Sequence, residues 1–332
     1  MNSPPPLATA GAVLAETAPA AGLARWAGHA RAMAADCSRL TRPRIALMVL
    51  ATVVTAFWVT GGGRDDAVHL VGLLVGTALV AASSSIANQI LERDTDRLMP
   101  RTARRPLVTG GLSVSTAWLL TAATCAAGAV IATVSAGWPA AAAAIATWLL
   151  YVVVYTPMKR WSPLNTAVGA VAGALPVAIG WLAADGPARL AAGDAASALT
   201  AAALGTVLYL WQFPHFMAIA WLYRGQYSAA GLRMLTVDDP SGLRAAGQSL
   251  AAALAMVPVS LVLAVPSGSI RLFLAAAVAS IVYGGAAVRF AVRRDDASAR
   301  TLLFVSLGSL LALLTATVLF GQPRFPLPSI QP

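Results

Sequence analysis

Residues 68–106 read VHLVGLLVGTALVAASSSIANQILERDTDRLMPRTARRP, an apolar run that leads directly into a densely charged one. Positions four apart on a helix differ by only about 40° in direction, so Asn88, Glu92 and Asp96 form one acidic edge where an apolar helix ends. The side chain of Asp94 points about 160° away from that of Asp96 around the helix axis, so Asp94 lies on another face. Carboxylate and amide oxygens suit Mg²⁺, and the arginines that follow suit phosphate oxygens. This stretch therefore predicts a site for a divalent metal ion and a diphosphate.

The composition identifies a polytopic membrane protein. The chain has 332 residues, of which 58% are hydrophobic and only 11% are charged, whereas a soluble domain carries roughly 25% charged residues. Apolar runs long enough to span a bilayer recur from residue 43 onward, and they are continuous rather than alternating, which favours helices over a barrel. The net charge of +10 would suggest nucleic acid in a soluble protein. Here the basic residues lie in short loops, so we expect no nucleic-acid partner, and the lipid bilayer is the expected environment.

The fold class expected from these runs is all-α, with nine transmembrane helices and a cytoplasmic N-terminus. The expected spans are residues 43–61, 68–91, 114–135, 138–156, 163–184, 196–222, 243–265, 270–290 and 300–320. With this orientation, most loop arginines and lysines fall on the cytoplasmic side, as the positive-inside rule requires. All the polar motifs then lie on that face.

Three regions are expected along the chain. Residues 1–42 form a basic cytoplasmic segment, disordered at its start and then either a helix lying on the membrane surface or a plain basic tail. Residues 43–322 form the membrane domain, and residues 323–332 form a short tail. Two pairs of glycines spaced by four, Gly72/Gly76 and Gly169/Gly173, are interpreted as notches for close helix packing.

A second polar motif, YTPMKRWSPLN, begins at residue 155. Pro157 should end one helix, because proline lacks the amide hydrogen. Ser162 and Pro163 should begin the next helix as its N-cap and first residue. Lys159 and Arg160 would thus be held on a tight turn, where they either bind an anion or merely anchor the helix ends.

A third polar motif, WQFPHF, begins at residue 211. Pro214 should kink its helix, and Gln212 and His215 lie beside that kink at membrane depth. The pair is interpreted as part of a site, although a single buried histidine is more often structural. Asn165, in the first turn of its own helix, either lines a cavity or caps the turn.

Together these motifs carry a resemblance to a known family. The stretches NQILERDTDRLMPRTARRPL, YTPMKRWSPLNTAVGAVAGALPVAIGW and WQFPHFMAIAWLYRGQYSAAGLRML resemble the UbiA-type intramembrane prenyltransferases, and among them the heme-farnesylating members, the protoheme IX farnesyltransferases or heme O synthases. The resemblance covers roughly residues 40–320. Its most specific part is WQxPHF, which separates heme-prenylating members from those that prenylate quinones or chlorophyll. The family is a nine-helix bundle whose active site lies at the cytoplasmic end, which implies a bacterial-type inner-membrane enzyme.

The resemblance also implies roles for individual residues. Asn88, Glu92 and Asp96 match an NxxxDxxxD-type motif that holds Mg²⁺ on a prenyl diphosphate, with Glu92 at the middle position. Lys159 and His215 are expected to join them in catalysis. Further matching positions, expected to bind substrate, are Arg97, Arg101, Arg104, Arg105, Tyr155, Arg160, Asn165, Gln212, Gln226 and Tyr227.

The implied reaction transfers a farnesyl group from farnesyl diphosphate to a vinyl group of heme b, with addition of water, and yields heme O and diphosphate. Such an enzyme would have heme-processing or terminal oxidase assembly proteins as partners. One position departs from the family pattern, because Gln226 stands where an acidic residue commonly precedes Tyr227. The number of metal ions therefore stays open, with Asp238 or Asp239 as substitute ligands.

Two other functions remain open from the sequence. One is prenyl transfer to another acceptor, such as a quinone precursor. The other is a permease in which Asp96 and His215 relay protons or bind substrate near a broken helix. The acidic edge lies at the membrane rim rather than at the midplane, which argues against transport.

Overall fold

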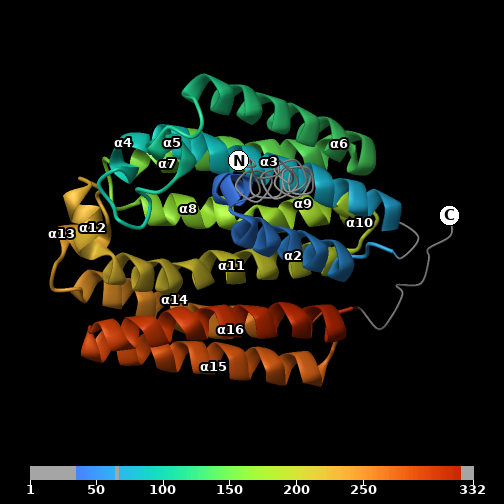
Figure 1. The fold of residues 1–332 in the computed structure, drawn as a ribbon. Coiled ribbons are helices and arrows are strands. Elements are labelled where there is room, and N and C mark those ends of the chain that lie inside the picture. Colours follow the sequence, from blue (N-terminus) through green and yellow to red (C-terminus); the bar gives the residue numbers. More distant parts are fainter. Residues whose placement is uncertain (1–34, 64–66, 323–332) are drawn as a thin grey trace, which may run out of the picture.

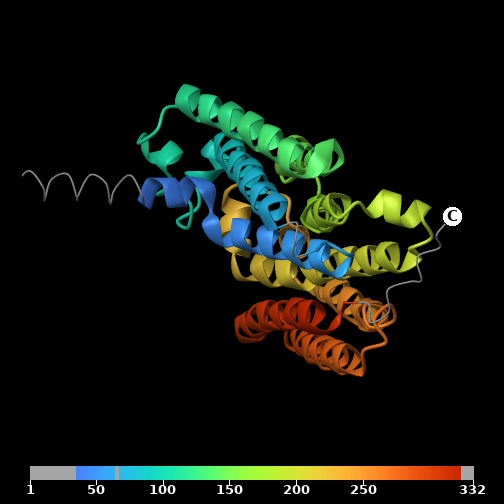
Figure 2. The ribbon, with the colours of Figure 1, turned by 90° about the vertical axis from the view of Figure 1, so that its right-hand side faces the viewer.

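The computed structural model describes residues 35–63 and 67–322, and the regular structure within these ranges is helical throughout. The long elements lie side by side and form one bundle (Figures 1 and 2). They are α2 (Pro43–Val59), α3 (Ala67–Leu91), α6 (Val114–Leu149), α8 (Asn165–Ala174), α9 (Pro176–Ala183), α11 (Ala195–Leu222), α14 (Leu243–Val262), α15 (Ile270–Arg293) and α16 (Asp296–Phe320).

Most of the short elements gather at one end of the bundle, on the left of Figure 1. We call this the polar end; it comprises α4 (Arg93–Asp96), α5 (Pro106–Thr109), α7 (Thr156–Met158), α12 (Arg224–Ala229) and α13 (Leu235–Asp238). The remaining short helix, α10 (Gly186–Ala191), lies at the opposite end. The three polar motifs of the sequence thus lead toward one end of the molecule.

Length and hydropathy identify seven helices in the described residues that can cross a membrane. The count rises to eight if the short helix Ala35–Thr41 and α2, which meet at an angle of 52°, are taken together as one span. This confirms an all-helical membrane protein. The predicted number of nine spans and the cytoplasmic N-terminus stay predictions.

One of the seven spans, Val114–Met158, folds back on itself. The Ser83 hydroxyl donates to the Thr121 carbonyl at 2.9 Å, and Trp148 Nε1 donates to the same hydroxyl at 2.9 Å. A straight helix would separate positions 121 and 148 by about 40 Å, so the chain must reverse between them. The reversal falls at Gly137, whose φ of 79° is left-handed and suits glycine. This geometry favours the separate helices 114–135 and 138–156 that the sequence predicts.

Close packing of α3 against α6 depends on glycine, as predicted for the first glycine pair. A Cβ added to Gly76 would lie 2.7 Å from the Gly128 carbonyl oxygen, and one added to Gly128 would lie 2.6 Å from the Gly76 carbonyl oxygen. In the second pair, Gly169 lies against the Tyr155 ring and Gly173 against the Gln212 amide. The second pair therefore makes room for side chains of the predicted site.

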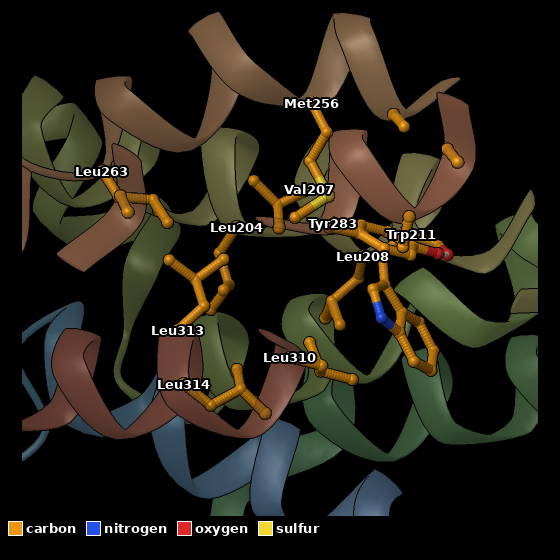
Figure 3. Packing of buried hydrophobic residues seen from close by; sticks show 14 of the residues in the cluster. Leu204, Val207, Leu208, Trp211, Met256, Leu263, Tyr283, Leu310, Leu313 and Leu314 are labelled. Atoms are coloured by element: carbon orange, nitrogen blue, oxygen red, sulfur yellow. Dashed lines mark hydrogen bonds between the residues drawn. The ribbon is translucent and has the colours of Figure 1, made fainter. Parts of the chain in front are cut away.

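The largest hydrophobic core joins α11, α14, α15 and α16 (Figure 3). Met256 and Leu310 are buried there beside Trp211 and Tyr283. The polar atoms of both aromatic side chains are satisfied: Trp211 Nε1 donates to the Ser306 carbonyl and Tyr283 Oη donates to the Trp211 carbonyl, each at 2.7 Å. Such pairing is what a buried Trp or Tyr requires, and it fixes α11 against α15 and α16.

The helix ends at Met158, one residue beyond the predicted end at Pro157. Before that end the chain widens into a π-helix, η1 (Leu150–Tyr155), and continues as α7 (Thr156–Met158). The Thr156 hydroxyl donates to the Tyr151 carbonyl at 2.8 Å within this wider turn. Single π-helical turns within helices are frequent at functional sites.

The predicted start of the next helix is also shifted. Helix α8 begins at Asn165, with Leu164 rather than Ser162 at its N-cap. Ser162 Oγ instead accepts the Leu164 amide hydrogen at 3.2 Å, inside the preceding turn. By contrast, α11 continues through Pro214 without ending, as predicted.

Residues 35–42 pack onto the membrane bundle. Leu40 is buried against Ile86 and Leu107, and Gln89 Nε2 donates to the carbonyls of Arg39 and Leu40 at 3.1 and 2.8 Å. The predicted disordered start of the chain and the tail from residue 323 lie outside the described residues. The division at residue 42 stays a prediction.

We predict that Gly76→Ala destabilises the protein by about 1–3 kcal/mol, because the new methyl group overpacks against a backbone carbonyl that cannot move aside. Thermal unfolding in detergent would measure the change. Gly285→Ala on α15 is the matched control, since a Cβ there meets no atom within 4 Å. Equal unfolding temperatures for Gly76→Ala and wild type would contradict the claim that close packing of α3 against α6 requires glycine at position 76.

Candidate active site

The structure places the predicted acidic edge on one continuous helical surface. Helix α3 ends at Leu91, but the Glu92 amide still donates to the Asn88 carbonyl at 2.9 Å and the Asp96 amide to the Glu92 carbonyl at 2.8 Å. The helical spacing therefore persists into α4. Asn88 and Asp96 are fully buried and Glu92 is 9% exposed, whereas Asp94 is exposed on another face.

Each buried carboxylate has its own cation. Lys159 Nζ lies 2.6 Å from Glu92 Oε1, and Arg105 Nη1 contacts Asp96 Oδ2 directly and lies 3.8 Å from Glu92 Oε2. Lys159 also lies over the Tyr155 ring, 4.4 Å from its centre, in cation–π geometry. The turn after α7 and the loop before α5 are thus held on the acidic edge by charge.

The pKa values of this cluster reflect competition between burial and charge. Burial alone would raise the pKa of Glu92, but the positive charges of Lys159, Arg42 and Arg105 outweigh it and lower that pKa. Burial alone would lower the pKa of Lys159, but Glu92 outweighs it and raises that pKa. For Asp96, burial together with the negative charge of Glu92 outweighs Arg105, and its pKa is raised.

Three buried oxygens of the predicted site residues have no hydrogen-bond partner: Asn88 Oδ1, Asp96 Oδ1 and Gln226 Oε1. Asn88 Nδ2 donates to the Thr156 hydroxyl at 3.1 Å, which leaves the amide oxygen free to accept. An unpaired buried oxygen is costly, and these are the hard donors that Mg²⁺ prefers. Two of the three belong to the predicted metal-binding motif, so the residues present fit a divalent ion.

The described residues contain no cluster of three or more His, Cys, Asp or Glu side chains arranged to hold a metal. In the described residues, such side chains alone therefore do not form a complete ligand shell for a metal ion. Mg²⁺ characteristically binds one or two carboxylates and completes its shell with water and substrate phosphates. The donor set of two carboxylates and an amide agrees with that mode.

The structure separates Gln212 from His215. Gln212 Nε2 donates to the carbonyls of Ala170 and Leu208, each at 3.0 Å, and so ties α11 to α8. His215 stacks on Trp211 at 4.7 Å and its Nδ1 lies 2.8 Å from the Ser306 hydroxyl on α16. The two side chains thus contact different neighbouring helices, and no contact joins either of them to the acidic edge.

Asn165 ties two loops together. It is fully buried, and its Nδ2 donates to the Ser162 carbonyl at 2.7 Å and to the Arg233 carbonyl at 2.9 Å. The turn that carries Lys159 is thereby fixed to the loop after α12, where the Arg233 amide also donates to the Lys159 carbonyl at 2.7 Å.

The other predicted basic residues differ in their surroundings. Arg101 lies against Tyr223 and Tyr227, and its Nη2 donates to Tyr227 Oη at 3.4 Å. Arg160 donates to the Leu91 carbonyl at 3.4 Å. Arg97 and Arg104 are exposed, and of the predicted arginines only Arg105 contacts the acidic edge.

Asp238 and Asp239 are both engaged away from the acidic edge. Asp238 pairs with Arg233 at 3.0 Å. The Asp239 carboxylate accepts the Ser241 hydroxyl and the Arg244 amide hydrogen, which caps the start of α14. Both carboxylates thus have partners within the loop between α13 and α14 or at its ends.

Sequence reasoning missed Arg42. It was assigned to the basic N-terminal segment, yet its charge acts on Glu92, Asp96 and Arg105, so it belongs to the same cluster. A count of loop charges does not distinguish Arg42 from any other arginine. The one sequence feature that sets it apart is its position directly before Pro43, at the start of the first apolar run.

Two cavities, of about 380 and 420 Å³, lie elsewhere in the bundle. The first is lined by residues such as His69, Asp185 and Arg189, near α10, and the second lies between α9 and α11. Neither is lined by the acidic edge, whose carboxylates are covered by their own cations.

A polytopic helical bundle with a buried acidic motif and basic residues at one end defines the class of intramembrane enzymes that handle prenyl diphosphates. A model of the UbiA prenyltransferase family matches residues 49–310. This chain therefore belongs to the UbiA prenyltransferase family.

Curated relatives carry a more specific name. The chain is 41% identical over 288 residues to a protoheme IX farnesyltransferase of Rhodopirellula baltica, covering 84% of this chain and 98% of the relative. It is 35% identical over 302 residues to the protein of the same name from Solibacter usitatus, covering 87% and 99%.

Solved structures share the fold at low identity. One neighbour, from work on digeranylgeranylglyceryl phosphate synthase in membranes, has a TM-score of 0.70 at 13% identity and covers 86% of this chain and 97% of its own. A UbiA homologue from Archaeoglobus fulgidus, bound to GPP and Mg²⁺, has a TM-score of 0.60 at 19% identity and covers 85% and 99%.

We predict that Lys159→Met destabilises the protein by about 3–5 kcal/mol, because it leaves the buried Glu92 carboxylate without its nearest cation. Denaturant unfolding in mixed micelles would measure the loss. The double variant Glu92→Gln/Lys159→Met should lose less than the two single variants combined, since neither charge is then stranded. Arg160→Met, at an exposed neighbouring residue, is the control. If the loss of stability in the double variant equalled the sum of the losses in the two single variants, Glu92 and Lys159 would not be energetically coupled.

Proposed function

We propose that this protein transfers a farnesyl group from farnesyl diphosphate to a vinyl group of heme b, forming heme O and diphosphate. The names of its relatives and the family match support the reaction. The observation that carries the site assignment is the cluster of Asn88, Glu92 and Asp96, buried together beside Lys159 and Arg105 with oxygens still unpaired.

The diphosphate is assigned to the cations of this cluster. Lys159 and Arg105 are the charged groups closest to the acidic edge, and a guanidinium and an ammonium are the usual protein partners of phosphate oxygens. They stabilise the negative charge that grows on the leaving diphosphate as its bond to carbon breaks. Because both are partly buried, that stabilisation is weakly screened by solvent.

Asn88, Glu92 and Asp96 are the residues that would hold Mg²⁺. The A. fulgidus homologue was solved with GPP and Mg²⁺, and the unpaired oxygens of Asn88 and Asp96 support the same preference here. When bound, the ion supplies positive charge to the diphosphate and makes it a better leaving group.

Transfer itself requires little covalent participation by the protein. The C1–O bond of farnesyl diphosphate breaks and diphosphate leaves with the electron pair. The vinyl group of heme b attacks the allylic cation, and water adds to the resulting carbocation and loses a proton. The apolar helices limit access of water to the first cation. The faces of Tyr151 and Tyr155, whose ring centres lie 5.2 Å apart, are suited to a nearby positive charge.

The location of the enzyme follows from its helices and charge pattern. Its long apolar elements make it an integral membrane protein. The polar end is assigned to the cytoplasmic face of a bacterial-type inner membrane because that end carries most loop arginines and lysines. Terminal oxidase assembly or heme-processing proteins are the corresponding partners.

We predict that Glu92→Gln and Asp96→Asn each lower turnover by at least about 10²-fold, because each removes a charge that binds the metal–diphosphate complex. Formation of the farnesylated heme, followed by mass spectrometry, is the measurement. Asp94→Asn is the matched control, since Asp94 is exposed and should leave turnover near wild type. Near-normal rates in both edge variants would refute the site.

Those assays should also depend on the metal. Wild-type turnover is expected to stop when a chelator removes divalent ions and to return when Mg²⁺ is added in excess. Both edge variants should remain folded by gel filtration and circular dichroism, so that loss of rate reports on chemistry.

The acceptor is tested by supplying farnesyl diphosphate with either heme b or 4-hydroxybenzoate to membranes containing the protein. We expect heme O as the product, with no prenylated benzoate. Membranes that lack the protein are the blank. Prenylation of the benzoate without heme O would assign the chain to a different acceptor within the same family.

A further inference from the structure

Arg42 occupies an unusual backbone position at the edge of the site. It links the short helix Ala35–Thr41 to α2 with φ 49° and ψ 61°, in the left-handed region. A residue other than glycine held there costs of order 1–3 kcal/mol, and such strain concentrates at functional sites. The following residue, Pro43, restricts the backbone of Arg42 further.

Surrounding contacts keep this strained turn in place. Gln89, one residue after Asn88 on α3, donates to the carbonyls of Arg39 and Leu40. Leu40 is buried against Ile86 and Leu107, and Leu107 lies two residues after Arg105. The turn is therefore anchored on both segments that carry the acidic edge and its cation.

The Arg42 guanidinium has an unpaired nitrogen. Its Nη2 is buried and has no hydrogen-bond acceptor in the described part of the chain. The turn that carries Arg42 is anchored on α3 through Gln89 and beside Arg105 through Leu107, the segments that hold the carboxylates of Glu92 and Asp96 and one of their cations. Yet those two carboxylates are already paired, Glu92 with Lys159 and Asp96 with Arg105.

The cluster thus contains one more cation than it has anions. Two carboxylates face three cations, and the third cation has a buried N–H group that nothing accepts. A buried unpaired charged donor is strongly unfavourable, so it indicates a missing anionic acceptor. The anion must reach a position beside the acidic edge, where the proposed diphosphate site lies.

We propose that Arg42 binds the diphosphate of the prenyl substrate, as a third cation beside Lys159 and Arg105, and that the turn before α2 is part of the active site. This inference rests on the proposed function. It extends the site to a segment that the sequence assigns to the N-terminal region. A carboxylate of the acceptor could satisfy the same guanidinium, and the experiment distinguishes the two anions.

The test compares variants at position 42 with a neighbour. Arg42→Gly removes the guanidinium and suits the left-handed backbone, so it separates binding from folding. Arg42→Lys retains the charge without the planar donor group. Arg44→Ala is the matched control, because Arg44 is exposed two residues away. Affinity for inorganic pyrophosphate with Mg²⁺, KM for farnesyl diphosphate and KM for heme b are measured for each purified full-length variant.

We expect Arg42→Gly to weaken pyrophosphate binding and to raise KM for farnesyl diphosphate about 10- to 100-fold, the loss typical of a charge-assisted hydrogen bond. KM for heme b should stay unchanged, and the ligand-free protein should unfold at the wild-type temperature or above. Arg42→Lys should fall between these values, and Arg44→Ala should match wild type.

Three results would overturn the inference. Wild-type pyrophosphate affinity in Arg42→Gly would show that the guanidinium does not bind the diphosphate. A higher KM for heme b alone would assign it to the acceptor's carboxylates. A lower unfolding temperature for Arg42→Gly with unchanged pyrophosphate affinity would make its role structural. A wild-type protein that binds no pyrophosphate and forms no farnesylated product would instead refute the proposed function itself.

Discussion

Neutralising two carboxylates buried at the rim of a membrane is the constraint on which the polar end of this protein depends. Glu92 and Asp96 lie where α3 passes into α4, and a buried charge without a partner costs several kcal/mol. Their partners come from distant segments, Lys159 from the turn after α7 and Arg105 from the residue before α5. Folding of these connections is therefore coupled to the acidic edge.

The same pairs explain how a site for a polyanion can be stable without its ligand. The cations that would contact a diphosphate are held beside the carboxylates that would hold its metal ion, so each charge compensates the other while the site is empty. If a diphosphate and a divalent ion bind together as proposed, the cations would gain phosphate oxygens and the carboxylates would hold the metal. The charges are rearranged rather than newly buried, which limits the desolvation cost of binding.

The helices that carry the site could largely be predicted from the sequence, because local signals determine them. The apolar runs located the long helices within a few residues, and spacing by four placed Asn88, Glu92 and Asp96 on one edge. The signals that failed were also local ones, overridden by distant contacts. Ser162 was expected to cap α8, but its turn is tied to the loop beyond α12 through Asn165.

Arg42 shows why part of the site could not be predicted. Its significance depends on the anchoring of a short helix by Gln89 and on the charges around it, and neither appears as a spacing in the sequence. The two polar residues of the WQFPHF motif show the same limit, since one pattern places Gln212 and His215 together while the structure directs them to α8 and α16. A linear motif identifies residue types but not their partners.

The balance of charge also bears on Gln226, which stands where the family resemblance leads one to expect an acid. Its buried Oε1 is unpaired, so it can accept a donor or approach a cation, but it brings no negative charge to hold one. Asp238 pairs with Arg233, and the Asp239 carboxylate accepts the Arg244 amide hydrogen at the start of α14. Lys159 and Arg105 already contact the acidic edge, and the proposal adds the charge of Arg42. If the proposed site binds a diphosphate, these side chains would supply positive charge that a second metal ion would otherwise bring.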